Sequence, residues 1–287
     1  MELLIQNGYD SPYFLACGAH SETYRIRETA AGRWYLGKIS REKDILWRES
    51  VLLQNLIHPL FPKWKVYFSD HEKACLVMEY IAGCNLEELL KRRGRMSVRA
   101  TAGIMLDLAD GLSYLHERNP AVIYRDLKPS NIIIGQDGRV RLVDLGAAGS
   151  DHKMKAGTPA YAAPEQFSEK GGSTRTDIYA YGKVMHYMLT GKNPCVPPYQ
   201  MLPARNYDKK IPRDMERIIE CCLADEAAVR YPRMRDVKRQ ILYVYGNLSR
   251  KSLWGGFKLA DGKKKGKVYY EKNILKGNYI GEKDFQI

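Results

Sequence analysis

The sequence predicts an α+β fold in two parts, with strands concentrated early in the chain and helices after them. Residues 1–82 contain short runs rich in β-branched and aromatic residues, whereas the pattern from residue 83 onward is mainly helical. The chain has 287 residues, 45% hydrophobic and 28% charged, a composition that supports a large folded core. We expect a cleft where the two parts meet.

Strand-like and helix-like segments follow one another along the chain. The first part holds strand-like runs at 13–17, 23–28, 33–40 and 74–80, which are interrupted by one helical segment at 42–57. The second part begins with a helix-like segment at 85–90. Four apolar residues then recur at three- and four-residue spacing and predict an amphipathic helix: Ile104, Leu108, Leu112 and Leu115. Residues 177–191 are apolar on nearly every side and predict a helix in the core, and Cys221 and Cys222 predict a helix with one thiol buried.

A β-hairpin is predicted at 132–134 and 140–143, because an Asp-Gly pair joins two apolar runs. The hairpin starts after Asn131 and ends on Asp144, so both side chains should lie close to Asp126 in the segment YRDLKPSN. Carboxylate and amide oxygens suit Mg2+, which proteins usually bind through one or two carboxylates and substrate phosphates. Taken alone, the segment could also be a solvated turn.

The order of these motifs resembles the signature of eukaryotic-type (Hanks-type) serine/threonine protein kinases, especially bacterial members. The resemblance covers roughly residues 10–245 and rests on Arg125-Asp126, Lys128, Asn131, Asp144-Leu145-Gly146 and Ala163-Pro164-Glu165. Tyr124 stands where the family usually has His, and Leu145 where it usually has Phe. The resemblance implies a bilobal protein-kinase-like fold, with a β-rich N-lobe at 1–82, a helical C-lobe at 83–248 and a basic extension at 249–287.

The resemblance also implies a role for each polar residue of this region. Asp126 would be the catalytic base, and Lys128 would stabilise the transferring phosphoryl group. Asn131 and Asp144 would bind Mg2+ (or Mn2+), while Lys38 would contact the α and β phosphates of ATP.

Glu49 is the expected ion-pair partner of Lys38, because its distance from His58-Pro59 matches the αC helix of the family. Glu42 is the weaker alternative. Without the resemblance, both glutamates and the lysine would be read as ordinary surface charges.

The nucleotide pocket has weaker sequence support. The loop ACGAHSETY aligns with the glycine-rich loop through Ala16, Gly18, Ser21 and Thr23, so only the middle glycine is kept. Gly18 remains where the backbone would come closest to phosphate, although the other substitutions imply a stiffer lid. The resemblance places the hinge at Glu79, Tyr80 and Ile81, with Met78 at the back of the adenine pocket.

Three further residues that match the family are expected to stabilise the fold. Glu165 and Arg230 correspond to a buried family ion pair. Asp177 corresponds to a helix-capping carboxylate that braces the catalytic loop, the segment YRDLKPSN at 124–131.

Arg125 corresponds to the arginine that pairs with a phosphate on the activation segment, which here spans residues 144–165, and Thr158 to a threonine that hydrogen-bonds the catalytic Asp and Lys. Ser150 is the plausible phosphorylation site, although Asp151 could supply Arg125 with a permanent carboxylate. We therefore expect Ser150 to be at most a modulator, and GSD at 149–151 could also be an ordinary polar turn.

The leading hypothesis is an ATP- and Mg2+-dependent kinase that phosphorylates Ser/Thr hydroxyls of protein substrates. A pseudokinase would be marked by loss of Lys38, Asp126, Asn131 or Asp144, and none is lost. A small-molecule phosphotransferase would generally lack the Ala-Pro-Glu segment and the GTPAYAAPE platform.

Bulk properties set the expected partners and location. The net charge of +13 suggests nucleic-acid binding. The basic runs at 91–95 and 263–267 lack interleaved aromatic residues, however, which argues against this function. No apolar run is long enough for a membrane anchor, and the start lacks the features of a signal peptide, so we expect a cytoplasmic protein. The six cysteines form no metal-binding pattern and are expected to be reduced thiols.

Overall fold

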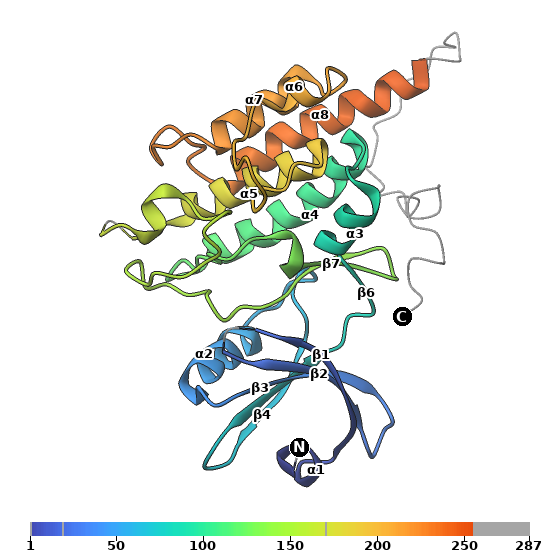
Figure 1. The fold of residues 1–287 in the computed structure, drawn as a ribbon, viewed down its shortest axis with the longest axis vertical. Coiled ribbons are helices and arrows are strands. Elements are labelled where there is room, and N and C mark those ends of the chain that lie inside the picture. The colour runs from blue at the N-terminus through green and yellow to red at the C-terminus, as the bar shows by residue number, and fades with distance from the viewer. Residues whose placement is uncertain (1, 19, 170, 255–287) are drawn as a thin grey trace.

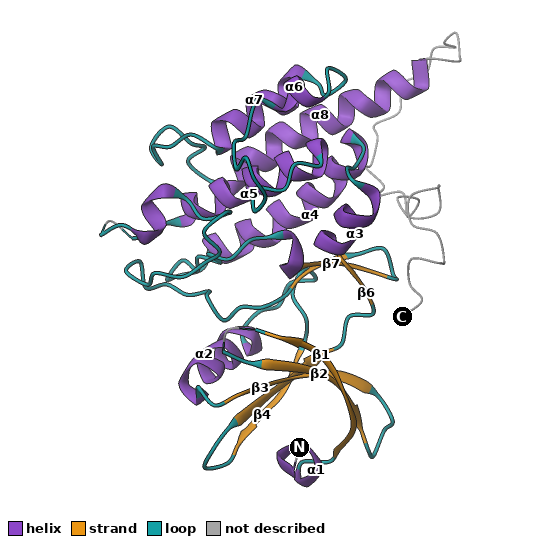
Figure 2. Ribbon diagram, viewed as in Figure 1, coloured by secondary structure: helices purple, strands orange, loops and turns teal. Residues whose placement is uncertain are grey.

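The computed structural model describes residues 2–18, 20–169 and 171–254 and is drawn in Figure 1. Strands gather in the first part of the chain and helices in the second, and a small sheet lies between them (Figure 2). The predicted α+β bilobal architecture is confirmed. Of the predicted extension at 249–287, only the start is described, as the end of the last helix, and the rest lies outside the described residues.

The N-lobe is an antiparallel five-stranded sheet of order β1-β2-β3-β5-β4. Its strands are β1 (Tyr9–Cys17), β2 (Glu22–Glu28), β3 (Trp34–Ser40), β4 (Trp64–Ser69) and β5 (Ala74–Glu79). Side chains alternate across β5: Cys75 and Val77 join a cluster with helix α1 (Glu2–Gln6), while Leu76 and Met78 join the main core. The sequence patterns predicted four of these strands and missed β4 and α1.

Helix α2 (Lys43–Gln54) is shorter than the predicted segment and packs near β4 and β5. Its buried residues are Leu46, Glu49, Ser50 and Leu53, which share one face at helical spacing. A glutamate therefore lies on the face that turns toward the interior.

The C-lobe is built from helices α3 (Leu86–Arg93), α4 (Val98–His116), α5 (Thr174–Thr190), α6 (Ala204–Tyr207), α7 (Arg213–Cys222) and α8 (Met234–Trp254). Asn85, Ser97 and Ser173 cap α3, α4 and α5 through their side chains. The four apolar residues predicted for α4 are all buried, and α5 is buried on nearly every side. On α7 Cys222 is buried and Cys221 partly exposed, as the sequence predicted.

A small three-stranded sheet, β6 (Gly83–Asn85), β7 (Ile132–Gly135) and β8 (Val140–Leu142), lies at the junction of the lobes. The hairpin β7–β8 turns at Gly138, whose φ of 80° favours glycine. The backbone N–H of Val143 donates to the carbonyl of Asn131 at 2.9 Å. The hairpin therefore brings Asn131 and Asp144 to the same end of the small sheet.

Among the described residues, no helix has the length and apolar character that a membrane span requires.

Candidate active site

Three charged residues, from β3, α2 and the loop after β8, meet between the lobes. Lys38 of β3 donates from Nζ to Oε2 of Glu49 at 2.7 Å and to Oδ1 of Asp144 at 2.8 Å. The alternative partner Glu42 is engaged elsewhere, at 2.5 Å from Nδ1 of His20. The predicted pair of Lys38 with Glu49 is confirmed, and Glu49 Oε1 also accepts the N–H of Leu145 at 3.1 Å.

Burial and charge compete at this cluster. Burial by itself lowers the pKa of Lys38, but the Glu49 and Asp144 carboxylates outweigh it and raise that pKa above its usual value. Burial likewise opposes ionisation of Asp144, yet Lys38 holds the pKa of this carboxyl below its usual range. Lys38 is therefore a fixed cation and Asp144 a carboxylate at neutral pH.

A second cluster surrounds Asp126 in the catalytic loop. Thr158 Oγ1 donates to Asp126 Oδ1 at 2.7 Å, and Lys128 Nζ lies 2.8 Å from Asp126 Oδ2. Lys128 also donates to Thr158 Oγ1 at 2.8 Å, so the three side chains form a closed triangle. Asn131 Nδ2 donates to the carbonyl of Asp126 at 2.9 Å and fixes the loop from its other side.

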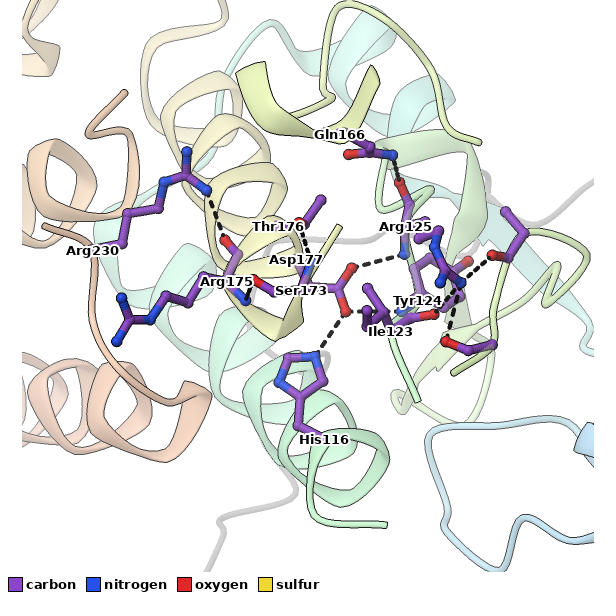
Figure 3. A network of polar contacts seen from close by, with 12 residues as sticks. His116, Ile123, Tyr124, Arg125, Gln166, Ser173, Arg175, Thr176, Asp177 and Arg230 are labelled. Atoms are coloured by element: carbon purple, nitrogen blue, oxygen red, sulfur yellow. Dashed lines mark hydrogen bonds and ion pairs between the residues drawn. The ribbon is translucent and has the colours of Figure 1, made fainter. Parts of the chain in front are cut away.

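The backbone is strained at two of these positions. Arg125 and Asp144 have φ of 69° and 63°, a left-handed conformation that side-chain-bearing residues rarely adopt. Asp177, wholly buried on α5, accepts the N–H groups of Tyr124 and Arg125 at 2.8 Å each (Figure 3). His116 Nε2 lies 2.7 Å from the same carboxylate and holds it in place.

The donor set fits a hard cation bound together with phosphates. Asn131 and Asp144 offer an amide and a carboxylate, the oxygen ligands that Mg2+ prefers. Asp144 uses Oδ1 for both its bonds, to Lys38 and to the N–H of Gly146, and its side chain is 47% exposed. Mg2+ usually keeps several waters and is bound through one or two carboxylates together with substrate phosphates, which fits two protein ligands at this place.

Residues 15–244 match the protein kinase domain. The chain belongs to this family. The RAC-beta serine/threonine-protein kinases of Homo sapiens and Mus musculus are each 31% identical to it over 241 residues. The Xenopus laevis RAC-beta serine/threonine-protein kinase A is also 31% identical. These alignments cover 79% of this chain and 46% of each relative, so the chain spans about half the length of these curated relatives.

The expected hinge of this kinase domain connects β5 to β6. Met78 is buried and belongs to the main core, whereas Tyr80 and Ile81 are partly exposed. The side chain of Glu79 accepts the N–H of Lys63 at 3.1 Å, and its own N–H donates to the Lys63 carbonyl at 2.8 Å.

The glycine-rich loop of other kinases is a short turn here. Gly18 donates its N–H to the carbonyl of Ser21 at 2.8 Å, and Ala16 pairs with Thr23 where β1 meets β2. The turn is therefore closed by a main-chain bond between Gly18 and Ser21.

The two residues that differ from the usual kinase motifs, Tyr124 and Leu145, are both buried. Leu145 belongs to the main core, as expected of an apolar replacement. Tyr124 is wholly buried, burial raises the pKa of its phenol well above the usual value, and its neutral hydroxyl donates to the carbonyl of Val143. The hydroxyl thus links the catalytic loop to the residue before Asp144.

Arg125 binds main-chain carbonyls, whereas the sequence suggested a phosphate at Ser150 or the carboxylate of Asp151. Its guanidinium is buried and donates to the carbonyls of Ala147 at 3.0 Å, Gly149 at 3.1 Å and Asp151, not to the carboxylate of Asp151. The Asp151 carboxylate accepts the N–H of Lys153 instead. Ser150 is exposed between these carbonyls.

The architectural matches are confirmed with one correction. Arg230 forms a two-pronged pair with Glu165, at 2.7 and 2.8 Å, and its side chain is completely buried. Asp177 braces the catalytic loop as expected, but it does not cap its helix, because the cap of α5 is Ser173.

Two side chains at the site had no sequence signal of their own. His116 ends the amphipathic helix α4, and Gln166 directly follows Glu165. Their partners are a carboxylate and carbonyls distant in sequence, which periodicity cannot reveal.

Proposed function

We propose that this kinase domain is an active enzyme that transfers the γ-phosphate of ATP to Ser/Thr hydroxyls of protein substrates. The observation that supports it best is that the chain holds both the ion pair of Lys38 with Asp144 and the triangle of Asp126, Lys128 and Thr158, with Lys128 close enough to help lower the pKa of Asp144. A pseudokinase or a small-molecule phosphotransferase would not require all of these groups together with the Ala-Pro-Glu platform. Protein substrates and ATP are thus the proposed partners, and likeness to bacterial members and a cytoplasmic location stay predictions.

In this proposal each residue has one task. Lys38, held by Glu49, positions the α and β phosphates. Asp126 orients the acceptor hydroxyl and accepts its proton as the oxygen attacks the γ-phosphorus and the bond to ADP breaks. Lys128 neutralises charge on the transferring group.

Asn131 and Asp144 would hold Mg2+ (or Mn2+), which when bound neutralises charge on the β and γ phosphates. The rest of the site is supplied by Met78, Glu79 and Ile81 around the adenine and by Gly18 above the phosphates.

The decisive experiment is phosphate transfer from labelled ATP to a generic acceptor such as casein or myelin basic protein. We expect Asp126→Asn, Lys38→Ala and Asp144→Ala each to lower transfer at least ~100-fold, because each removes a charge-stabilising group. Asp214→Asn, at an exposed position of α7, is the matched control and should transfer at the wild-type rate. Wild-type transfer by Asp126→Asn would contradict the proposed function.

ATP binding should also strengthen with Mg2+. Without the cation, Asp144 faces the triphosphate as a like charge, and the folded protein keeps that carboxyl ionised. Calorimetric titration of ATP with and without Mg2+ should show tighter binding with the cation, and Asp144→Asn should reduce the difference. Equal affinity in both conditions for the wild type would rule out this metal assignment.

A further inference from the structure

Gln166 lies at the centre of a buried set of hydrogen bonds that the proposed reaction does not use. It belongs to the short 3-10 helix Pro164–Phe167, and its side chain is fully buried. Its Nε2 donates to the carbonyl of Arg125 at 2.9 Å and to the carbonyl of Ala156 (Figure 3 shows the bond to Arg125). Its Oε1 accepts the N–H of Ala163 at 3.3 Å, so the amide uses both its donors and its acceptor.

Only an amide whose Nε2 faces the two carbonyls and whose Oε1 faces the N–H satisfies all three partners. Two carbonyl oxygens face Nε2, so an oxygen in its place would repel both and leave them unpaired in the interior. The neighbouring backbone is shaped to the amide as well. Gly157 has φ of 125°, and a Cβ there would overlap Gln166 Nε2 and lie 2.8 Å from the Arg125 carbonyl.

The two carbonyls belong to the segments whose side chains meet at the reacting centre. Arg125 directly precedes Asp126, and Ala156 lies just before Thr158. Thr158 in turn donates to Asp126 at 2.7 Å. One side chain therefore ties the catalytic loop to the activation segment beside the hydrogen bond that orients the proposed base.

We propose that Gln166 is a positioning residue that clasps the activation segment onto the catalytic loop and so keeps Asp126 and Thr158 in register for phosphate transfer. The inference rests on the proposed kinase function and adds to it a residue that touches neither ATP nor the acceptor. The clasp acts through Arg125 and Ala156 and is made entirely of protein groups.

Arg125 reinforces the clasp from its other end. Its guanidinium binds the carbonyls of Ala147, Gly149 and Asp151, so the start of the activation segment is also held without an added phosphate. The exposed Ser150 side chain takes no part in these bonds. Ser150→Ala should therefore transfer phosphate at the wild-type rate, because order in this segment depends on the clasp.

The competing explanation is that Gln166 only fills space. Gln166→Glu separates the two, because it keeps the shape and replaces the donors with an oxygen. Gln166→Met keeps an unbranched chain and has no donor. A space-filling role predicts little change in either variant, whereas the clasp predicts a loss in both.

The test is steady-state phosphate transfer by the full chain, with kcat and the two KM values measured separately. We expect kcat to fall about 10- to 100-fold in Gln166→Glu, the range expected when a reacting group is displaced by up to 1 Å, and KM for ATP to change less than about twofold. Gln240→Glu, at an exposed position of α8, controls for the added charge. Ile241→Val, on the buried face of α8, controls for lost stability, because it should lower the melting temperature and leave kcat unchanged.

Amide hydrogen exchange of residues 152–160 gives a readout that does not need activity. The clasp predicts faster exchange there in both Gln166 variants than in Ile241→Val at equal melting temperature. If the wild type transfers no phosphate, the proposed function is wrong. The hydrogen-exchange measurement still decides in that case whether the clasp exists. Wild-type kcat and wild-type exchange in Gln166→Glu would overturn the proposal, as would complete loss of transfer in Ser150→Ala. If Gln166→Glu does not fold, the same measurements are made on Gln166→Met, for which the clasp predicts the same changes.

Discussion

Asp126 is surrounded by groups that orient its two oxygens separately. Thr158 donates to Oδ1, and Lys128 lies against Oδ2. A carboxylate with both oxygens occupied by protein groups keeps one rotamer, so an acceptor hydroxyl meets it in a fixed geometry. The threonine hydroxyl is the smaller and more easily tested half of this arrangement.

We expect Thr158→Val to lower phosphate transfer about 10-fold, because a hydrogen bond to a charged group is lost while the side-chain shape is kept. Thr158→Ser keeps the hydroxyl and should remain within about threefold of the wild type. Transfer rates of the three proteins, with melting temperatures to confirm folding, check this. Equal rates in the valine variant would show that Asp126 does not depend on the threonine.

Sequence reasoning found the residues whose role follows from type and spacing. Lys38, Asp126, Asn131 and Asp144 carry charges or amides at family-specific intervals, so their clustering could be predicted. Gln166 could not, because its partners are main-chain carbonyls, which every residue has and no pattern marks. The partners of Arg125 could not be predicted for the same reason, because they are main-chain carbonyls and the sequence suggested only a phosphate or a carboxylate.

Helix α2 places Glu49 where it contacts two other parts of the site. Its buried face delivers Glu49 to Lys38, and the same carboxylate accepts the N–H of Leu145. The helix therefore links β3 to the start of the activation segment. Its existence could be predicted from the helical pattern and the role of Glu49 from the family resemblance, whereas its end at Gln54 could not, because Asn55 is an ordinary polar residue that the helix pattern tolerates.

Glu49→Gln should lower phosphate transfer about 10- to 100-fold, since a hydrogen bond to a charged group contributes about 1.5–3 kcal/mol. The matched variant Glu42→Gln should change transfer little, because Glu42 pairs with His20 at the surface and does not reach Lys38. Steady-state transfer at saturating ATP distinguishes the two. A larger loss in Glu42→Gln than in Glu49→Gln would contradict the assignment of the ion pair.

For the whole molecule, the C-lobe core carries buried polar groups that tie its stability to pH. The two-part architecture could be predicted because strand-like and helix-like segments separate along the chain. The missed strand β4 (Trp64–Ser69) has no fully buried side chain, and it takes its place from pairing with β5. Buried titratable groups such as His186 were equally invisible, since an apolar helix pattern does not mark the histidine within it.

His186 should make the protein less stable in mild acid. Burial lowers the pKa of this imidazole below its usual 6.5, with Lys183 adding to the effect and the bond to the Leu202 carbonyl opposing it. Because the folded pKa is the lower one, the unfolded chain binds the proton first as the pH falls below 6.5. Stability is therefore complete above pH 6.5 and is lost by at most about 1.4 kcal/mol per pH unit down to the lowered pKa.

Melting temperatures of the wild type and His186→Gln, measured between pH 7.5 and 5.5, isolate this contribution from that of the other histidines. The glutamine can still donate to the Leu202 carbonyl but does not titrate, so its melting temperature should fall less on acidification even if it starts lower. The difference between the two curves is the decisive quantity, because other titrating groups act on both proteins alike. Parallel curves would mean that His186 binds its proton equally well in the folded and unfolded chains, which the buried position beside Lys183 argues against.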